Sequence, residues 1–80
     1  MARDLYSDAE ALAERLWHDG RHEWSDRLSG AIREGATASE ILMALRYHLA
    51  GLLDSDADLD EATRTSATEL HSSIDVVLGP

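Results

Sequence analysis

Four aspartates at alternate positions form the pattern in this sequence that most suggests ligand chemistry. The run consists of Asp54, Asp56, Asp58 and Asp60. The first three match the oxygen-ligand positions that open an EF-hand calcium loop. However, Leu59 stands where that loop needs a glycine for its sharp turn, and Thr65 stands where a bidentate glutamate should close the site. The favoured interpretation is therefore a solvated acidic turn that caps helices, and no metal ligand is assigned.

Two histidines have a spacing that could serve a metal ion. His18 and His22 are four residues apart, so one unbroken helix would present both imidazoles on the same face. Gly20 between them is expected to interrupt that helix, and no clear third ligand follows beyond Asp19 or Glu23. The sequence therefore predicts no metal site here.

Catalytic constellations are missing from the sequence. It has no cysteine nucleophile, no glycine-rich phosphate loop and no paired carboxylates set into an apolar run. Asp54-Ser55 is similar to the Asp-Ser-Leu site of acyl carrier proteins, which are also acidic four-helix domains. Here the third residue is Asp56, and the chain that follows is short for their later helices. We expect neither an enzyme nor a bound cofactor.

The elements that must position any site are amphipathic helices. Apolar spacing of three and four residues predicts helices at about 5–18, 21–34, 38–53 and 59–77. No strand alternation or internal repeat is visible, and the one proline is residue 80. The predicted fold is an all-α, compact antiparallel bundle of four helices in a single domain, residues 1–80.

The segment Thr37–Leu53 is expected to be the central helix. Thr37 followed by Glu40 matches a capping box. One broad face is apolar and is predicted to face the core: Ile41, Leu42, Leu45, Leu49, Leu52 and Leu53. The opposite face lacks the charges of a solvated surface and instead carries Met43, Ala44, Tyr47, Ala50 and Gly51. A helix with two apolar faces is either central to a fold or binds something on its second face.

Local signals predict further details of the other helices. Ser7 with Glu10 matches a capping box, although the apolar series Leu5, Ala9, Leu12 and Leu16 indicates that the first helix begins earlier. Asp58 or Asp56 is expected to cap the last helix, and Gly30 is expected on an exposed part of the second. The predicted core series of the last helix is Leu59, Thr63, Ala67, Leu70, Ile74 and Val77.

Charge excludes whole classes of partner. The formal net charge is −9, of which residues 54–80 carry −6. Nucleic acids and anionic membranes attract an excess of arginine and lysine, so neither is expected as a partner. The absence of cysteine and of any long apolar run fits a cytoplasmic protein.

The pattern LSGAIREGATASEILMALRYHLAGLL, followed by an acidic turn and a closing helix, resembles that of small helical immunity proteins from bacterial polymorphic-toxin systems. The resemblance covers residues 28–78. It implies a short, acidic, catalytically silent inhibitor of another protein. The Tyr-Tyr-Pro anchor of nuclease-colicin immunity proteins is absent, so no binding residue is carried over.

The leading hypothesis is a bacterial, non-enzymatic protein–protein interaction module, an immunity or antitoxin-like inhibitor that binds a basic partner. An acidic patch steers such an encounter, and a few aromatic or apolar anchors then hold the complex. The steering residues predicted are Asp54, Asp56, Asp58, Asp60 and Glu61, and the anchors are Tyr47, Met43 and Trp17.

The alternative is a homodimer of structural or regulatory role that uses the second apolar face of the Thr37–Leu53 helix. Ala44, Tyr47 and Gly51 lie at positions i, i+3 and i+7, where a symmetric copy would find a shallow groove. The absence of charges on this second face fits both the inhibitor and the homodimer hypotheses.

Overall fold

Four α-helices make up most of residues 4–79, which are the residues described by the computed structural model. The helices are α1 (Leu5–His18), α2 (His22–Glu34), α3 (Ala38–Ser55) and α4 (Glu61–Leu78). No strand occurs within these residues, so the predicted all-α class is confirmed. In the same residues, no helix combines the length and the apolar character that a membrane crossing requires.

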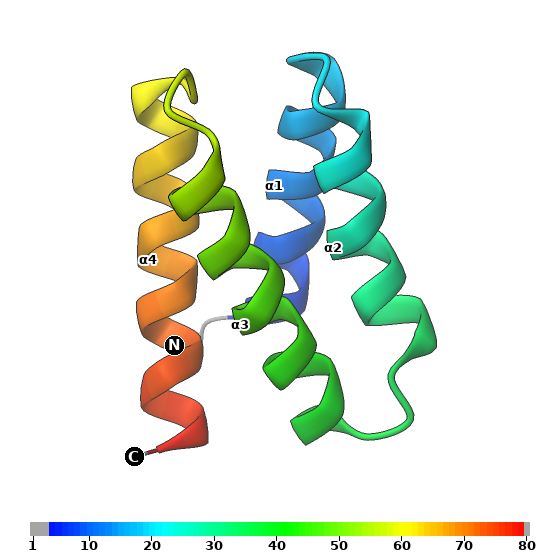
Figure 1. The fold of residues 1–80 in the computed structure, drawn as a ribbon. Coiled ribbons are helices and arrows are strands. Elements are labelled where there is room, and N and C mark those ends of the chain that lie inside the picture. The colour runs from blue at the N-terminus through cyan, green and yellow to red at the C-terminus, as the bar shows by residue number, and fades with distance from the viewer. Residues whose placement is uncertain (1–3, 80) are drawn as a thin grey trace.

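The helices form an antiparallel bundle in which each packs against two others (Figure 1). α1 contacts α2, α2 contacts α3, α3 contacts α4, and α4 returns to α1. The α1–α2 turn and the α3–α4 connection therefore lie at one end of the bundle, and the α2–α3 connection lies at the other. The predicted four-helix bundle is confirmed, and α3 lies diagonally opposite α1.

The helix starts follow the local capping residues, although not always the predicted ones. The Thr37 hydroxyl accepts the Glu40 N–H at 3.1 Å, as expected, but among the described residues the Glu40 carboxylate does not accept the Thr37 N–H in return. α1 is capped by Asp4, which accepts the Tyr6 and Ser7 N–H groups, so Ser7 is not the cap and the helix begins at Leu5, as the apolar series indicated.

The last helix also begins later than predicted. Asp60 caps α4 by accepting the Thr63 N–H at 3.3 Å, so neither Asp58 nor Asp56 has that role. Leu59 is buried, but it lies in the connection and not on the helix. Burial of this side chain anchors the connection, and the residue that follows it becomes the cap.

The core is built mainly from leucines of all four helices. The predicted α3 series holds: Leu42, Leu45, Leu49 and Leu52 are buried, with Ile41 and Leu53 at the margin. On α4 the prediction for Val77 is wrong, because its side chain is 60% exposed. The core stripe instead continues from Ile74 to Leu78, one full helical step of four residues.

Two glycines of the α2 segment leave space that neighbouring side chains use. Gly30 is buried, contrary to prediction, and a Cβ there would lie 3.1 Å from the Glu34 carboxylate. Gly35 ends α2, and a Cβ there would overlap the Ile41 side chain and approach the Ala31 carbonyl oxygen to 3.2 Å. The tight turn between these helices therefore requires glycine at position 35.

Gly35→Ala should lower the free energy of unfolding by about 1–3 kcal/mol, because the added methyl group overpacks against Ile41 and a backbone carbonyl. Urea denaturation followed by circular dichroism would measure the change. Ala36→Ser, at the exposed neighbouring position, is the matched control and should stay within about 0.5 kcal/mol of the parent. Equal stability of Gly35→Ala and the parent would show that the turn accommodates a Cβ at position 35, which would contradict this prediction.

Candidate protein-binding surface

The outward side of α3 carries an exposed apolar stripe. Met43, Tyr47 and Ala50 follow one another at helical spacing, and Asp54 continues the same line after another four residues. Met43 is 54% exposed and Tyr47 is 76% exposed. We call these four residues the α3 stripe. It is the place where two predicted anchors and one predicted steering residue are brought together.

One flank of the α3 stripe is formed by α2. A Cβ on Gly51 would lie 3.2 Å from the Trp24 ring, so the indole already occupies the space that this glycine leaves. The Arg27 guanidinium lies over the Trp24 ring, 4.5 Å from the ring centroid. The groove that Ala44, Tyr47 and Gly51 were predicted to offer a second copy is thus filled at Gly51 by this chain itself.

The other flank is formed by α4, where an ion pair already joins α4 to α3. Asp75 accepts a hydrogen bond from Arg46 at 3.0 Å and lies 3.4 Å from the Nδ1 atom of His71. Its carboxylate therefore already has two partners. The Arg46–Asp75 ion pair links α3 to α4, so on that side the carboxylate already has a positive partner.

His48 lies on α3 between the two flanks, edge-on to the Tyr47 ring at a centroid distance of 5.4 Å. Partial burial and, to a smaller extent, the positive charge of Arg27 lower the pKa of its imidazole. The neutral form of the imidazole is therefore favoured, and the positive charges beside the stripe come from Arg27 and Arg46.

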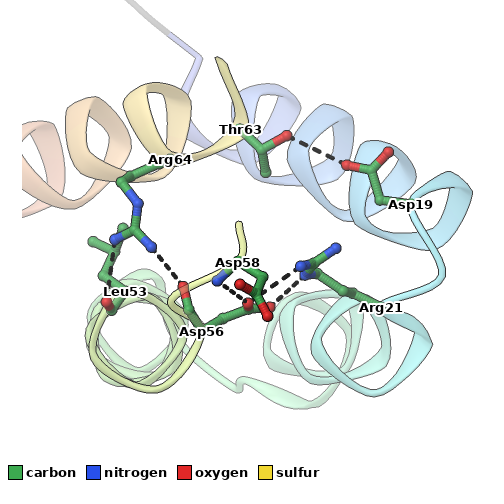
Figure 2. A network of polar contacts seen from close by, with 7 residues as sticks. All are labelled: Asp19, Arg21, Leu53, Asp56, Asp58, Thr63 and Arg64. Carbon is green, nitrogen blue, oxygen red and sulfur yellow. Dashed lines mark hydrogen bonds and ion pairs between the residues drawn. The ribbon is translucent and has the colours of Figure 1, made fainter. Parts of the chain in front are cut away.

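Some acidic side chains of the connection after α3 already have hydrogen-bond partners within the chain. Asp56 is its structural centre (Figure 2): Arg21 donates from Nε to one carboxylate oxygen and from Nη2 to the other, the latter at 3.2 Å. The Asp58 N–H donates to the same carboxylate at 3.1 Å. A bidentate arginine contact of this kind fixes orientation as well as distance. Asp56 therefore ties the α3–α4 connection to the start of α2.

A second arginine holds the end of α3 from the other side. Arg64 of α4 donates to the Leu53 carbonyl at 3.3 Å and to the Asp56 carbonyl (Figure 2). Carbonyls in the last turn of a helix lack partners within the helix, so a positive side chain there satisfies them. Buried Thr63 adds a long contact of 3.5 Å to Asp19 in the α1–α2 turn.

The five predicted steering residues consequently divide by role. Asp56 is held by Arg21, and Asp60 is occupied as the cap of α4. Asp54, Asp58 and Glu61 are exposed, and within residues 4–79 their carboxylates form no ion pair. These three are the acids that remain available to a partner.

Trp17 lies apart from the other predicted anchors. Its ring is 48% exposed and stacks on His22 at a centroid distance of 3.8 Å, across the α1–α2 turn. Since α1 is diagonal to α3, this aromatic pair is not part of the α3 stripe. His22 is therefore engaged with an indole, while His18 lies 3.9 Å from Glu14.

Sequence reasoning missed several exposed or linking residues. Val76 and Val77 are 81% and 60% exposed on α4, and their helical spacing had placed Val77 in the core. Arg21 and Arg64 were not singled out, although both lie close in sequence to acidic turns. The closeness of these arginines to acidic residues in the sequence was the signal that could have identified them as linking residues.

No group of three or more histidine or acidic side chains with metal-binding geometry occurs in the part of the chain that the structure describes. The alternate aspartates point to different partners: one to Arg21, one to the α4 backbone and others to solvent. Comparison of the chain with protein-family models, with curated proteins and with solved structures finds no match.

Asp56→Asn should reduce stability at pH 7, and the reduction should vanish in acid. Hydrogen bonding to Arg21, and then the positive charges of Arg21 and Arg64 and the Asp58 N–H, lower the pKa of the Asp56 carboxyl below its ordinary 3.8. The ionised group therefore adds stability above pH 3.8, and this contribution is lost as pH falls through the lowered pKa of the folded state.

The measurement is the thermal midpoint of the parent and the variant between pH 7 and pH 2. Asp54→Asn, which removes an exposed and unpaired carboxylate of the same connection, is the matched control and should show no such gap. A difference between parent and Asp56→Asn that stays constant across the pH range would contradict the ion-pair assignment.

Proposed function

We propose that this protein is a non-enzymatic interaction module that binds a basic protein partner, acting as an immunity or antitoxin-like inhibitor. The observation that carries the proposal is the continuity of the α3 stripe, in which exposed Met43 and Tyr47 lead directly to Asp54 at the acidic connection. An apolar anchor beside unpaired acids is the arrangement that recognition of a basic surface requires.

The charges support a two-step encounter. Asp54, Asp58 and Glu61 are exposed and unpaired among the described residues, so their field reaches into solvent and speeds the approach of a positive surface. Tyr47 then offers a large, amphipathic side chain with few rotatable bonds, which loses little conformational entropy on burial. Steering sets the rate of association, whereas the anchor sets the lifetime of the complex.

A bacterial cytoplasmic setting belongs to the same proposal. Support comes from the cysteine-free composition and from the resemblance of residues 28–78 to small bacterial immunity proteins. An inhibitor of this kind binds its target inside the producing cell.

Tyr47→Ala should weaken binding to the partner by about 30-fold, the loss typical of a central anchor of about 2 kcal/mol. The partner is first recovered by affinity capture with the parent protein and then purified, and binding is measured by biolayer interferometry. Val76→Ala, which truncates an equally exposed apolar side chain on α4, is the matched control and should bind like the parent. Equal affinity of Tyr47→Ala and the parent would exclude α3 as the binding surface.

The double variant Asp54→Asn with Glu61→Gln should slow association and flatten its salt dependence while leaving the dissociation rate nearly unchanged. Glu10→Gln with Glu69→Gln removes the same charge from exposed positions of α1 and α4 and controls for net charge. A dependence on salt that is the same for both double variants would contradict steering by the acidic connection.

The homodimer is the competing outcome of the same work, since Met43 and Tyr47 are exposed enough to pack against a second copy. Light scattering over a concentration series would detect it. A parent dimer that Tyr47→Glu converts to monomer would favour that alternative over the inhibitor.

A further inference from the structure

A groove runs along the junction of α2 and α3, beside the α3 stripe. Two hollows of about 550 and 520 Å³ lie along this junction, and both have Arg27 and His48 on their rims. One extends toward Gly35 and Glu40, and the other reaches Asp54. The two hollows adjoin at these two side chains, and we call them together the α2–α3 groove.

The end of the α2–α3 groove near the α2–α3 connection is acidic. Asp26, Glu34 and Glu40 line it, and their carboxylates have no ion-pair partner among residues 4–79. The Glu34 carboxylate extends over Gly30, where the absence of a Cβ leaves it room. Glu40 is free because the return half of its capping box is not formed. Arg27, by contrast, forms an ion pair with Glu23 within α2.

The middle of the groove is apolar and shallow. Trp24 and Tyr47 line it from α2 and α3, and Ala50 and Gly51 present little side chain between them. Arg27 and the imidazole of His48, whose pKa is lowered by partial burial and by the charge of Arg27, lie where the two hollows meet. The groove thus has carboxylates at one end, an aromatic centre, and Asp54 at the other end.

Its dimensions fit a helix. From Glu40 to Asp54 the groove follows α3 over about 21 Å, given a rise of about 1.5 Å per residue. Small side chains on its floor, Gly30, Ala31 and Ala44, let the backbone of a third helix approach closely. A helix of about 15 residues would span the groove and place its apolar face on Trp24 and Tyr47.

Resting on the function proposed above, we propose that the α2–α3 groove binds an arginine-bearing amphipathic helix of the partner. The guanidinium group matches two features of the groove: it pairs with carboxylates such as those of Glu34 and Glu40, and it stacks on an exposed ring such as that of Tyr47, since Arg27 already covers the Trp24 ring. The groove between α3 and α4 lacks this match, because Asp75 is already paired with Arg46 and His71. A second copy of this chain, with a net charge of −9, would bring like charges to the acidic end.

The test uses a synthetic probe. A helical peptide of about 15 residues with arginines near both ends and leucines and alanines between them is titrated into ¹⁵N-labelled protein and followed by NMR. The amides of Gly30, Gly35, Ala44 and His48 should shift, and a matched peptide with glutamate in place of arginine should leave them unmoved. Shifts confined to residues 54–61, the other acidic region, would overturn the proposal.

Glu34→Gln with Glu40→Gln should weaken the arginine peptide by about tenfold or more, as expected for the loss of charge-assisted hydrogen bonds. Glu10→Gln with Glu69→Gln, which changes the net charge equally, should leave its dissociation constant as in the parent. Equal weakening by both pairs would overturn a specific site in favour of general charge attraction.

Gly30→Ala distinguishes peptide binding in the α2–α3 groove from the stability of the fold. Alanine has the higher helix propensity and the flexible Glu34 carboxylate can move aside, so the thermal midpoint should rise. The displaced carboxylate should nevertheless weaken the arginine peptide. A Gly30→Ala protein that is more stable and binds the peptide as well as the parent does would contradict the proposed position of the helix.

The same variants, applied to the captured partner, distinguish the two proposals. If Tyr47→Ala weakens the partner but Glu34→Gln with Glu40→Gln does not, the binding function stands and the α2–α3 groove is not its site. If neither variant weakens it, both proposals fall. Weakening by both variants supports the arginine-bearing helix as the element recognised.

Discussion

The contact of Arg21 with Asp56 is the interaction on which the acidic end of this bundle depends. It joins residues that are 35 positions apart and links the start of α2 to the connection after α3. Arg64 holds the same connection from α4 through the Leu53 and Asp56 carbonyls. A run of acids would otherwise repel itself and extend into solvent. Two arginines give it a fixed course, so that Asp54, Asp58 and Glu61 project outward from an ordered end.

The fixed end of the bundle also determines which sides of α3 are open to a binding partner. With its leucine face in the core and its ends held by Thr37 and by Arg64, the helix has two sides left. Trp24 covers the side at Gly51, whereas Met43 and Tyr47 stay exposed. Exposed apolar side chains that lie together on a helix face without charges mark a candidate interaction surface. The proposed helix-binding groove and the acidic steering residues together account for that exposure.

The sequence was sufficient for the features that depend on local spacing. Helical periodicity located four helices to within a few residues, and the leucine face of α3 was predicted residue by residue. Thr37 was recognised as a cap because capping acts within three residues. Errors appeared where two local signals competed: Asp60 was passed over in favour of Asp58, and Val77 was placed in the core although Leu78 continues the stripe.

Contacts between distant segments could not be predicted in this way. Nothing in the spacing of Arg21 and Asp56 indicates that they meet, since the meeting depends on how the two connections stack at one end of the bundle (Figure 1). Gly51 was interpreted as open space for a partner because the position of Trp24 is set by the packing of α2 on α3. The acids of the connection were therefore predicted as one group, without separation into structural and exposed members.

Site-specific photo-crosslinking in cells of the source organism tests the central claim most directly. A photoreactive phenylalanine analogue replaces Tyr47 in one protein and Val76 in another, since both side chains are exposed and they lie on different helices. The account predicts that position 47 crosslinks to one basic protein through an arginine-bearing helix and that position 76 does not. Crosslinking of position 47 to a second copy of this chain, or of position 76 to the partner, would contradict it.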